Sequence, residues 1–204
     1  MRTLALDCAT EACTLALFDG TELIGRAHET IGRGHAERLV PLVAALPDKG
    51  RAAQILVGLG PGSFTGTRIG LSVARSLAIA WSAHTQGFST LALLAATGRR
   101  TLEVPRLTVA VNAGHGEVLV QSFLERQPGG EPRSVTPYEL SEVETQATII
   151  GNRAGALADH HPGTTAHEML PDARDALCIP LVQRLTRLSP LYARPPDARP
   201  SSGS

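Results

Sequence analysis

The sequence contains almost no lysine: Lys49 is the single lysine among 19 basic residues, and 19 acidic residues bring the formal net charge to zero. A protein that binds nucleic acid by itself usually has a broad surface of positive electrostatic potential, and a net charge of zero does not indicate one. RNA binding by this chain would therefore need local charge or a partner. The shortage also argues against a catalytic or phosphate-binding lysine.

Long apolar runs are lacking too. The richest apolar segment, residues 69–83, contains Arg75 and three serines, which disfavours a membrane span. The chain begins with the strand-like run MRTLALD and without the charged leader of a signal peptide, so a cytoplasmic location is expected. The three cysteines lack metal-ligand spacing and fit small buried thiols in a reducing compartment: Cys8, Cys13 and Cys178.

No metal site is expected, because the histidines are scattered. The isolated ones lie far apart along the chain: His35, His84 and His115. None of them belongs to a local pair such as H-x-x-x-H, and the adjacent histidines 160 and 161 sit in a polar loop that favours solvated side chains. A triad of Asp7, His35 and Ser63 is supported by residue identity alone, so no catalytic residue is assigned.

Apolar periodicity predicts an α/β fold. Three short apolar runs at the start predict an antiparallel meander, and a helix-spaced run follows over residues 35–46. The first half continues with a strand at 54–59, a loop at 60–66, a helix at 68–83, a short strand, and a helix at 91–97. This order is close to the ribonuclease-H-like arrangement, in which a meander leads into parallel strands joined by helices.

The second half resembles a reduced version of the first. Its expected elements are strands at 107–112 and 117–124, a weak helix at 137–144, a strand at 147–151 and a helix at 172–188. We therefore expect two lobes, residues 1–100 and 101–193. A Pro- and Ser-rich tail at 194–204 is expected to be disordered.

One loop has the form of a phosphate site without the residues of an active one. Gly60, Gly62 and Gly66 stand between a strand and a helix start, where free amides favour an anion. The lysine of a P-loop is missing, and the glycine spacing differs from that of a Rossmann turn. The hydroxyls of Ser63 and Thr65 are expected to cap the helix.

A second loop of this kind follows the first strand. In actin-like and sugar-kinase folds an acidic residue at the place of Asp7 supports a metal-bound nucleotide, while the turn that holds Thr10 approaches phosphate. Cys8 and Ala9 stand where glycine would favour that close approach. We assign four residues to degenerate phosphate loops: Asp7, Thr10, Gly62 and Ser63. No cofactor is expected, and a weakly bound or interfacial adenine nucleotide stays an open alternative.

Two helices are more apolar than one buried face requires. The helix at 68–83 carries two apolar stripes, one formed by Ile69, Val73, Leu77 and Ala80, and one by Leu71, Ala74, Ala78 and Trp81. Small residues such as Ser72 and Ser76 would let a partner helix approach closely. The helix at 35–46 shows the same excess. A protein interface and a core helix covered by the second lobe fit this pattern equally well.

Several strings are similar to the TsaB (YeaZ) family of bacterial tRNA threonylcarbamoyladenosine biosynthesis proteins. In chain order they are LALDCATEACTLALFDG, GHAERLVPLV, GLGPGSFTGTRIGLSVARSLAIAW and GFSTLALLA, all within about the first hundred residues. Later segments, AVNAGHGEVLV and SPLYARP, match more loosely. GPGSFTGTRIG is the most specific of these motifs.

The resemblance implies a two-lobed actin-like ATPase (ribonuclease H-like) fold with a reduced second lobe. It also implies a non-catalytic partner of a TsaD-type carbamoyltransferase in the modification of tRNA adenosine 37. A TsaE-type ATPase is the implied third component, tRNA is reached only through the complex, and the chain pairs with a second copy when TsaD is absent. The implied interface comprises His35, Leu39, Leu42, Val43, Leu46, Ile69, Ser72, Val73, Ser76, Leu77 and Ala80.

The chain departs from the family at one point and lacks its partner's catalytic motif. Asn112, Ala113 and Gly114 stand where the family commonly has Asp-Ala-Arg, which puts any contact of that arginine in doubt. After the strand at 85–88, where the partner has a metal-binding histidine motif, this chain has none. Two alternatives remain: a free-standing actin-like ATPase or small-molecule kinase, and a glycoprotease-like hydrolase whose activity would disappear with Ser63→Ala.

Overall fold

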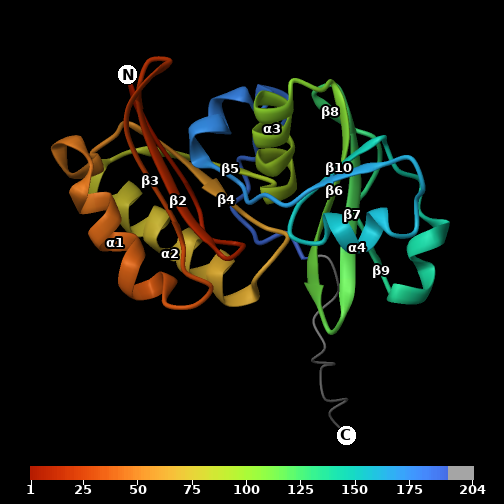
Figure 1. The fold of residues 1–204 in the computed structure, drawn as a ribbon. Helices are drawn as coiled ribbons and strands as arrows, with labels where there is room; N and C mark the ends of the chain where they lie inside the picture. The colour runs from red at the N-terminus through yellow and green to blue at the C-terminus, as the bar shows by residue number, and fades with distance from the viewer. Residues whose placement is uncertain (193–204) are drawn as a thin grey trace, which may run out of the picture.

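The computed structural model describes residues 1–192, so the tail at 194–204 lies outside the described residues. Two sheets form the two lobes (Figure 1). The first sheet has the order β3 (Glu22–Thr30), β2 (Ala12–Asp19), β1 (Arg2–Asp7), β4 (Gln54–Gly58) and β5 (His84–Phe88). Its first three strands are antiparallel, and β4 and β5 continue it in parallel. The ribonuclease-H-like order predicted from the sequence is confirmed.

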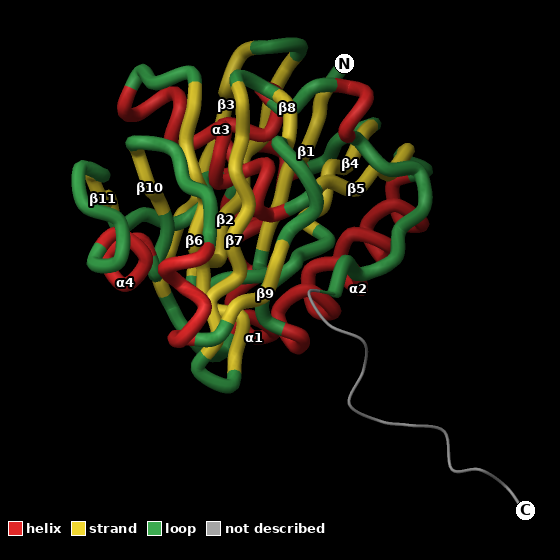
Figure 2. The backbone as a smooth tube through the Cα atoms, turned by 90° about the vertical axis from the view of Figure 1, so that its right-hand side faces the viewer, coloured by secondary structure: helices red, strands yellow, loops and turns green. Residues whose placement is uncertain are grey.

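The second sheet has six strands, four of them only two or three residues long, and is seen from its outer side in Figure 2. Its order is β11 (Thr165–His167), β10 (Thr148–Ile150), β6 (Arg106–Gly114), β7 (Glu117–Leu124) and β8 (Gln127–Pro128), with β9 (Arg133–Val135) also paired to β7. The short α4 (Ala154–Ala158) packs on this outer side through Leu157. A two-lobed α/β fold with a reduced second lobe is therefore present.

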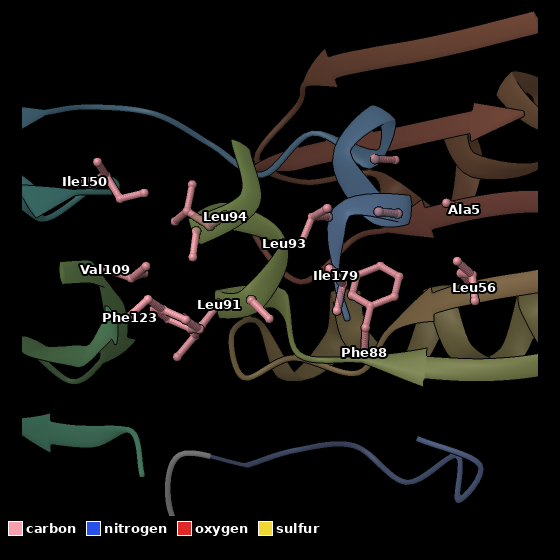
Figure 3. Packing of buried hydrophobic residues seen from close by; sticks show 14 of the residues in the cluster. Ala5, Leu56, Phe88, Leu91, Leu93, Leu94, Val109, Phe123, Ile150 and Ile179 are labelled. Atoms are coloured by element: carbon pink, nitrogen blue, oxygen red, sulfur yellow. The ribbon is translucent and has the colours of Figure 1, made fainter. Parts of the chain in front are cut away.

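One helix is shared by the two sheets. α3 (Thr90–Leu102) is buried from Thr90 to Gly98, which is why its sequence is almost wholly apolar or small. In Figure 3, Leu91, Leu93 and Leu94 of this helix lie between Ala5, Leu56 and Phe88 of the first sheet and Val109, Phe123 and Ile150 of the second. The lobes therefore have a common core.

The outer face of the first sheet carries the other two long helices, α1 (His35–Ala45) and α2 (Phe64–Trp81). Successive strand residues point to opposite faces, so Leu4 and Leu6 of β1 pack with these helices while Ala5 packs with α3. α2 begins earlier than expected, because Ser63 caps it by accepting a hydrogen bond from the Gly66 amide. The last three residues of the predicted loop at 60–66 are thus helical.

The sequence-based prediction is wrong for two helices of the second half. The segment at 172–188 forms two short 3-10 turns, η3 (Ala173–Cys178) and η4 (Leu181–Gln183), and 137–144 forms another, η2 (Pro137–Glu142). Pro180 separates η3 from η4, since it lacks an amide and its ring clashes with a helical backbone. Buried Asp172 instead ties η3 to the first lobe through Arg26 at 2.8 Å.

Residues 185–192 return to the first lobe, and we call them the C-terminal strap. The Leu191 amide donates to the Leu59 carbonyl at 2.7 Å, and Arg75 of α2 donates to the Leu188 carbonyl at 2.6 Å. Tyr192 stacks on Phe64 with ring centroids 5.8 Å apart. The strap covers one flank of α2, which the sequence did not predict. The division into residues 1–100 and 101–193 stays a prediction.

Candidate functional site

The two phosphate-loop candidates are folded against each other. The Ser63 amide donates to the Ala9 carbonyl at 2.7 Å, so a helix-start amide that would face an anion is already used. A Cβ on Gly62 would lie 2.1 Å from the Ala9 oxygen, and one on Gly66 would lie 2.0 Å from the Cys8 oxygen. These glycines therefore serve the contact between the loops, and carbonyl oxygens stand where a phosphate would need donors.

Asp7 lies beneath both loops and is fully buried. One carboxylate oxygen accepts the Ala9 amide at 2.8 Å, and the other accepts the Thr90 hydroxyl at 2.6 Å. Burial raises the pKa of Asp7 to about 6, and the hydrogen bond from Thr90 only partly opposes that effect. Both oxygens of Asp7 therefore have hydrogen-bond partners within the chain, and the bond to Thr90 joins β1 to the start of α3. The Asp7 side chain does not line the cavity above the loops, where a metal-bound nucleotide would lie.

The pKa of Asp7 predicts a pH-dependent loss of stability. Because the folded chain holds this proton up to about pH 6 and a free aspartate releases it near 3.8, the stabilisation is complete below pH 3.8 and is lost as the pH rises through 6. Asp7→Asn keeps the shape and removes the titration. Urea unfolding between pH 4 and 7.5 should show the variant gaining up to about 3 kcal/mol on the native chain. Parallel stability curves for the two proteins would contradict this.

A cavity of about 370 Å³ lies above the loops, between the lobes. Its lining includes Thr10, Gly62 and Ser63 of the predicted loop residues, as well as Asn112 and Gly114. Three of the four residues assigned to degenerate phosphate loops thus meet at one place, and Asp7 does not.

The cavity is bridged by a contact that the sequence did not indicate. The Asn152 amide group donates to both carboxylate oxygens of Glu11, at 2.8 and 3.0 Å, and the Asn152 carbonyl accepts the Asn112 amide at 3.0 Å. Asn152 lies outside every motif singled out in the sequence, and nothing in the sequence pairs it with Glu11, because the pair forms only when the lobes meet. The lining side chains that the structure describes include a carboxylate and no arginine or lysine, an environment that disfavours phosphate.

The residues of the candidate triad are each engaged elsewhere. The His35 Nε2 lies 3.4 Å from the Ala12 carbonyl oxygen, the Ser63 hydroxyl accepts the Gly66 amide at 3.1 Å, and Asp7 accepts from Thr90. This arrangement does not form a nucleophile with a general base. Within residues 1–192 no three His, Cys, Asp or Glu side chains gather as a metal site.

The structure separates the expected interface residues into two groups. Those on and after α1 are buried in the core of the chain itself: His35, Leu39, Leu42, Val43 and Leu46. Those on α2 are exposed or half-exposed: Ile69, Ser72, Val73, Ser76, Leu77 and Ala80. An apolar stripe along a helix indicates the side that faces a core, so the residues picked out on α1 are those that pack inside the chain itself. What α1 leaves for a partner is its other side, with Val40 51% exposed.

α2 keeps an open face between two neighbours. α1 lies beside it (Figure 1), and Ala36 of α1 lines a shallow groove with Ile69 and Val73. The C-terminal strap covers the opposite flank at Arg68 and Arg75. Between these neighbours the exposed residues are mainly small, with one large apolar side chain: Ser72, Ser76, Ala80 and Ile79, which is 83% exposed. We call these four residues the α2 face.

Comparisons with known proteins agree with the resemblance. A family described as TsaD, tRNA N6-adenosine threonylcarbamoyltransferase, matches residues 25–145. The tRNA threonylcarbamoyladenosine biosynthesis protein TsaB of Escherichia coli is 40% identical over 135 residues, covering 63% of this chain and 58% of that protein. TsaB of Haemophilus influenzae is 32% identical over 120 residues, covering 56% of this chain and 50% of that protein. The matches thus span little more than half the length of these curated relatives.

Solved structures resemble the whole chain. YeaZ from Pseudomonas aeruginosa superposes with a TM-score of 0.80 at 28% identity and covers 94% of this chain and 99% of that one. A second structure, described as an uncharacterized protein with similarity to peptidase YEAZ from Pseudomonas aeruginosa, gives a TM-score of 0.82 at 29% identity, with 95% and 99% covered. The reduced second lobe is therefore shared with these proteins.

Proposed function

Since the chain belongs to the TsaD family and is of the TsaB (YeaZ) type, we propose that it is a non-catalytic subunit in the threonylcarbamoylation of tRNA adenosine 37. In this proposal it binds a TsaD-type transferase and supports its active conformation, and the transferase carries out the chemistry. A TsaE-type ATPase joins the complex, and tRNA reaches the chain through its partners. Within residues 1–192 no helix is long and apolar enough to cross a membrane.

The closure of the two loops is the observation that carries the proposal. An active nucleotide site of this fold needs amides and an acidic side chain free to face the phosphates and their metal. Here the Ser63 amide is bonded to Ala9, and Asp7 is bonded to Thr90 beneath the surface. The segment after β5 does not offer free side chains for such a site either, because Leu91 and its neighbours are buried between the two sheets.

The α2 face supplies the surface that such a subunit needs. An interface between helices favours small residues where the backbones approach and an apolar anchor nearby, and the α2 face offers both. When no transferase is present, the same face is available to a second copy of the chain. The homodimer would therefore compete with the heterodimer for Ser72, Ser76 and Ala80.

Reconstitution tests the proposal. Purified chain, a TsaD-type transferase and a TsaE-type ATPase should together modify tRNA from threonylcarbamoyl-adenylate, and omission of the chain should reduce product by at least about tenfold, as expected for the loss of a supporting contact. The chain alone should yield none. Calorimetry of the isolated chain with ATP and magnesium provides the second measurement: tight binding with turnover would favour the free-standing ATPase and defeat the subunit proposal.

A further inference from the structure

Three polar side chains that line the interlobe cavity are each held by one hydrogen bond inside the chain. The Thr10 hydroxyl oxygen accepts the Ala12 amide at 3.1 Å, and the Asn112 side-chain carbonyl accepts the Gly114 amide at 3.0 Å. Ser63 is held by the capping bond at the start of α2. Among the described residues, none of the three side chains donates a hydrogen bond. Two hydroxyls and one amide group thus remain as oriented donors on the cavity wall.

The same cavity contains a fixed carboxylate, that of Glu11. Both carboxylate oxygens accept from Asn152, whose amide group is neutral, and no ion pair reaches Glu11 within the described residues. The backbone beneath it is held as well, because the amides of Ile31 and Gly32 donate to the Glu11 carbonyl at 2.9 and 3.2 Å. A carboxylate can accept about four hydrogen bonds, so Glu11 retains capacity for a cation.

The rest of the lining is apolar, and the cavity opens to solvent. Val111 is 4% exposed and forms part of the inner wall, whereas Phe64 is 54% exposed and lies at the rim. Asn112 and His115 at the rim are exposed too. The volume of about 370 Å³ falls in the range of sites for small molecules. A small ligand can therefore enter from solvent and reach the polar side chains.

We propose that this cavity binds a free α-amino acid with a small aliphatic side chain. The ammonium group pairs with Glu11, and the carboxylate accepts hydrogen bonds from the three oriented donors. The aliphatic side chain packs against Val111, which removes apolar surface of both from water. A zwitterion suits this lining because it brings a cation for Glu11 and acceptors for the donors without adding net charge. A phosphate would bring only negative charge to a site without arginine or lysine.

Three probes separate the two ends of the ligand. Calorimetry with the full-length chain should give saturable binding of L-valine with a Kd of roughly 10 µM to 1 mM, as expected for a ligand of this size. N-acetyl-L-valine lacks the ammonium group and L-valinol lacks the carboxylate, so each should bind at least about tenfold more weakly. The proposal is overturned if L-valine shows no saturable binding, or if either analogue binds as tightly as L-valine.

Two substitutions test the polar groups. Asn112→Asp keeps the oxygen that accepts the Gly114 amide and replaces the free donor with a negative charge, so L-valine should bind at least about tenfold more weakly. Glu11→Gln removes the charge that pairs with the ammonium group and should have a similar effect. Glu142→Gln is the matched control, because it removes an equal charge from an exposed position on η2. Native affinity in Asn112→Asp, or an equal loss in Glu142→Gln, would contradict the site. Circular dichroism checks the fold of each variant.

Amide chemical shifts locate the ligand. Three glycines line the cavity, and their amide signals should move as L-valine is added: Gly32, Gly62 and Gly114. The signal of Gly155 on α4 should stay in place, since this residue does not line the cavity. Shifts confined to the α2 face would overturn the assignment. None of the α2 face residues lines the cavity, so the site does not depend on a transferase partner, and its failure would leave the proposed function standing.

Discussion

Replacing Ser76 with arginine is expected to leave the chain folded and to weaken the proposed complex with a TsaD-type transferase roughly a thousandfold. Ser76 is exposed in the free chain, where a long charged side chain reaches water and changes stability little. In the complex it would lie between packed helices whose axes are about 8–10 Å apart. A guanidinium buried there without a partner costs about 4 kcal/mol, which corresponds to that loss of affinity.

Titration by surface plasmon resonance or calorimetry measures the effect, with circular dichroism as the check on folding. Ser141→Arg is the matched control, because Ser141 is also an exposed serine but lies on η2 of the second lobe. If Ser76→Arg bound the transferase as tightly as Ser141→Arg, the α2 face would not be the interface. Leu39→Arg is unsuitable for this purpose, since Leu39 is fully buried and its replacement would unfold α1.

Local patterns were sufficient to predict the first lobe. Alternating and helical apolar spacing predicted β1 to β5 and the three long helices in their observed order, because each of these elements turns one side to a core. For α1 these patterns left a core helix and an interface helix equally open, and the side chains that the resemblance assigned to an interface are buried in the core of the chain itself. Periodicity reports which residues avoid water, and it does not distinguish burial in the chain's own core from burial against a partner.

The second lobe and the site depended on contacts between distant residues. Glu11 accepts a hydrogen bond from Asn152, which is 141 residues later in the sequence, and Arg68 donates one to Tyr192, which is 124 residues later. No spacing rule connects such pairs, so the cavity bridge and the C-terminal strap were missed. The segment at 172–188 was predicted as a helix from its apolar spacing, whereas its acidic side chains are used to join the lobes. Tertiary ion pairs outweighed local propensity there.

Arg100→Leu is expected to lower the free energy of unfolding by about 3–4 kcal/mol, which tests that explanation. The Arg100 side chain is 41% exposed, whereas Asp175 is 2% exposed and its second oxygen has no hydrogen-bond partner within the described residues. Without the arginine, the buried carboxylate of Asp175 has no opposite charge beside it, and its desolvation lowers the free energy of unfolding. Urea unfolding at pH 7 measures the change.

The double variant Arg100→Leu with Asp175→Asn separates this effect from lost packing. Asparagine keeps the shape of Asp175 without its charge, so the double variant should recover about 2 kcal/mol of the loss. Asp175→Asn alone should cost about 1 kcal/mol, since the half-exposed Arg100 then turns to water. If the double variant were as unstable as the sum of the single ones, the pair would not be coupled, and η3 would be held by apolar contacts such as Ala173 and Ala176. Strong coupling would instead mean that the ion pair, formed between residues 75 positions apart, selects the 3-10 turn over the helix that the local sequence favours.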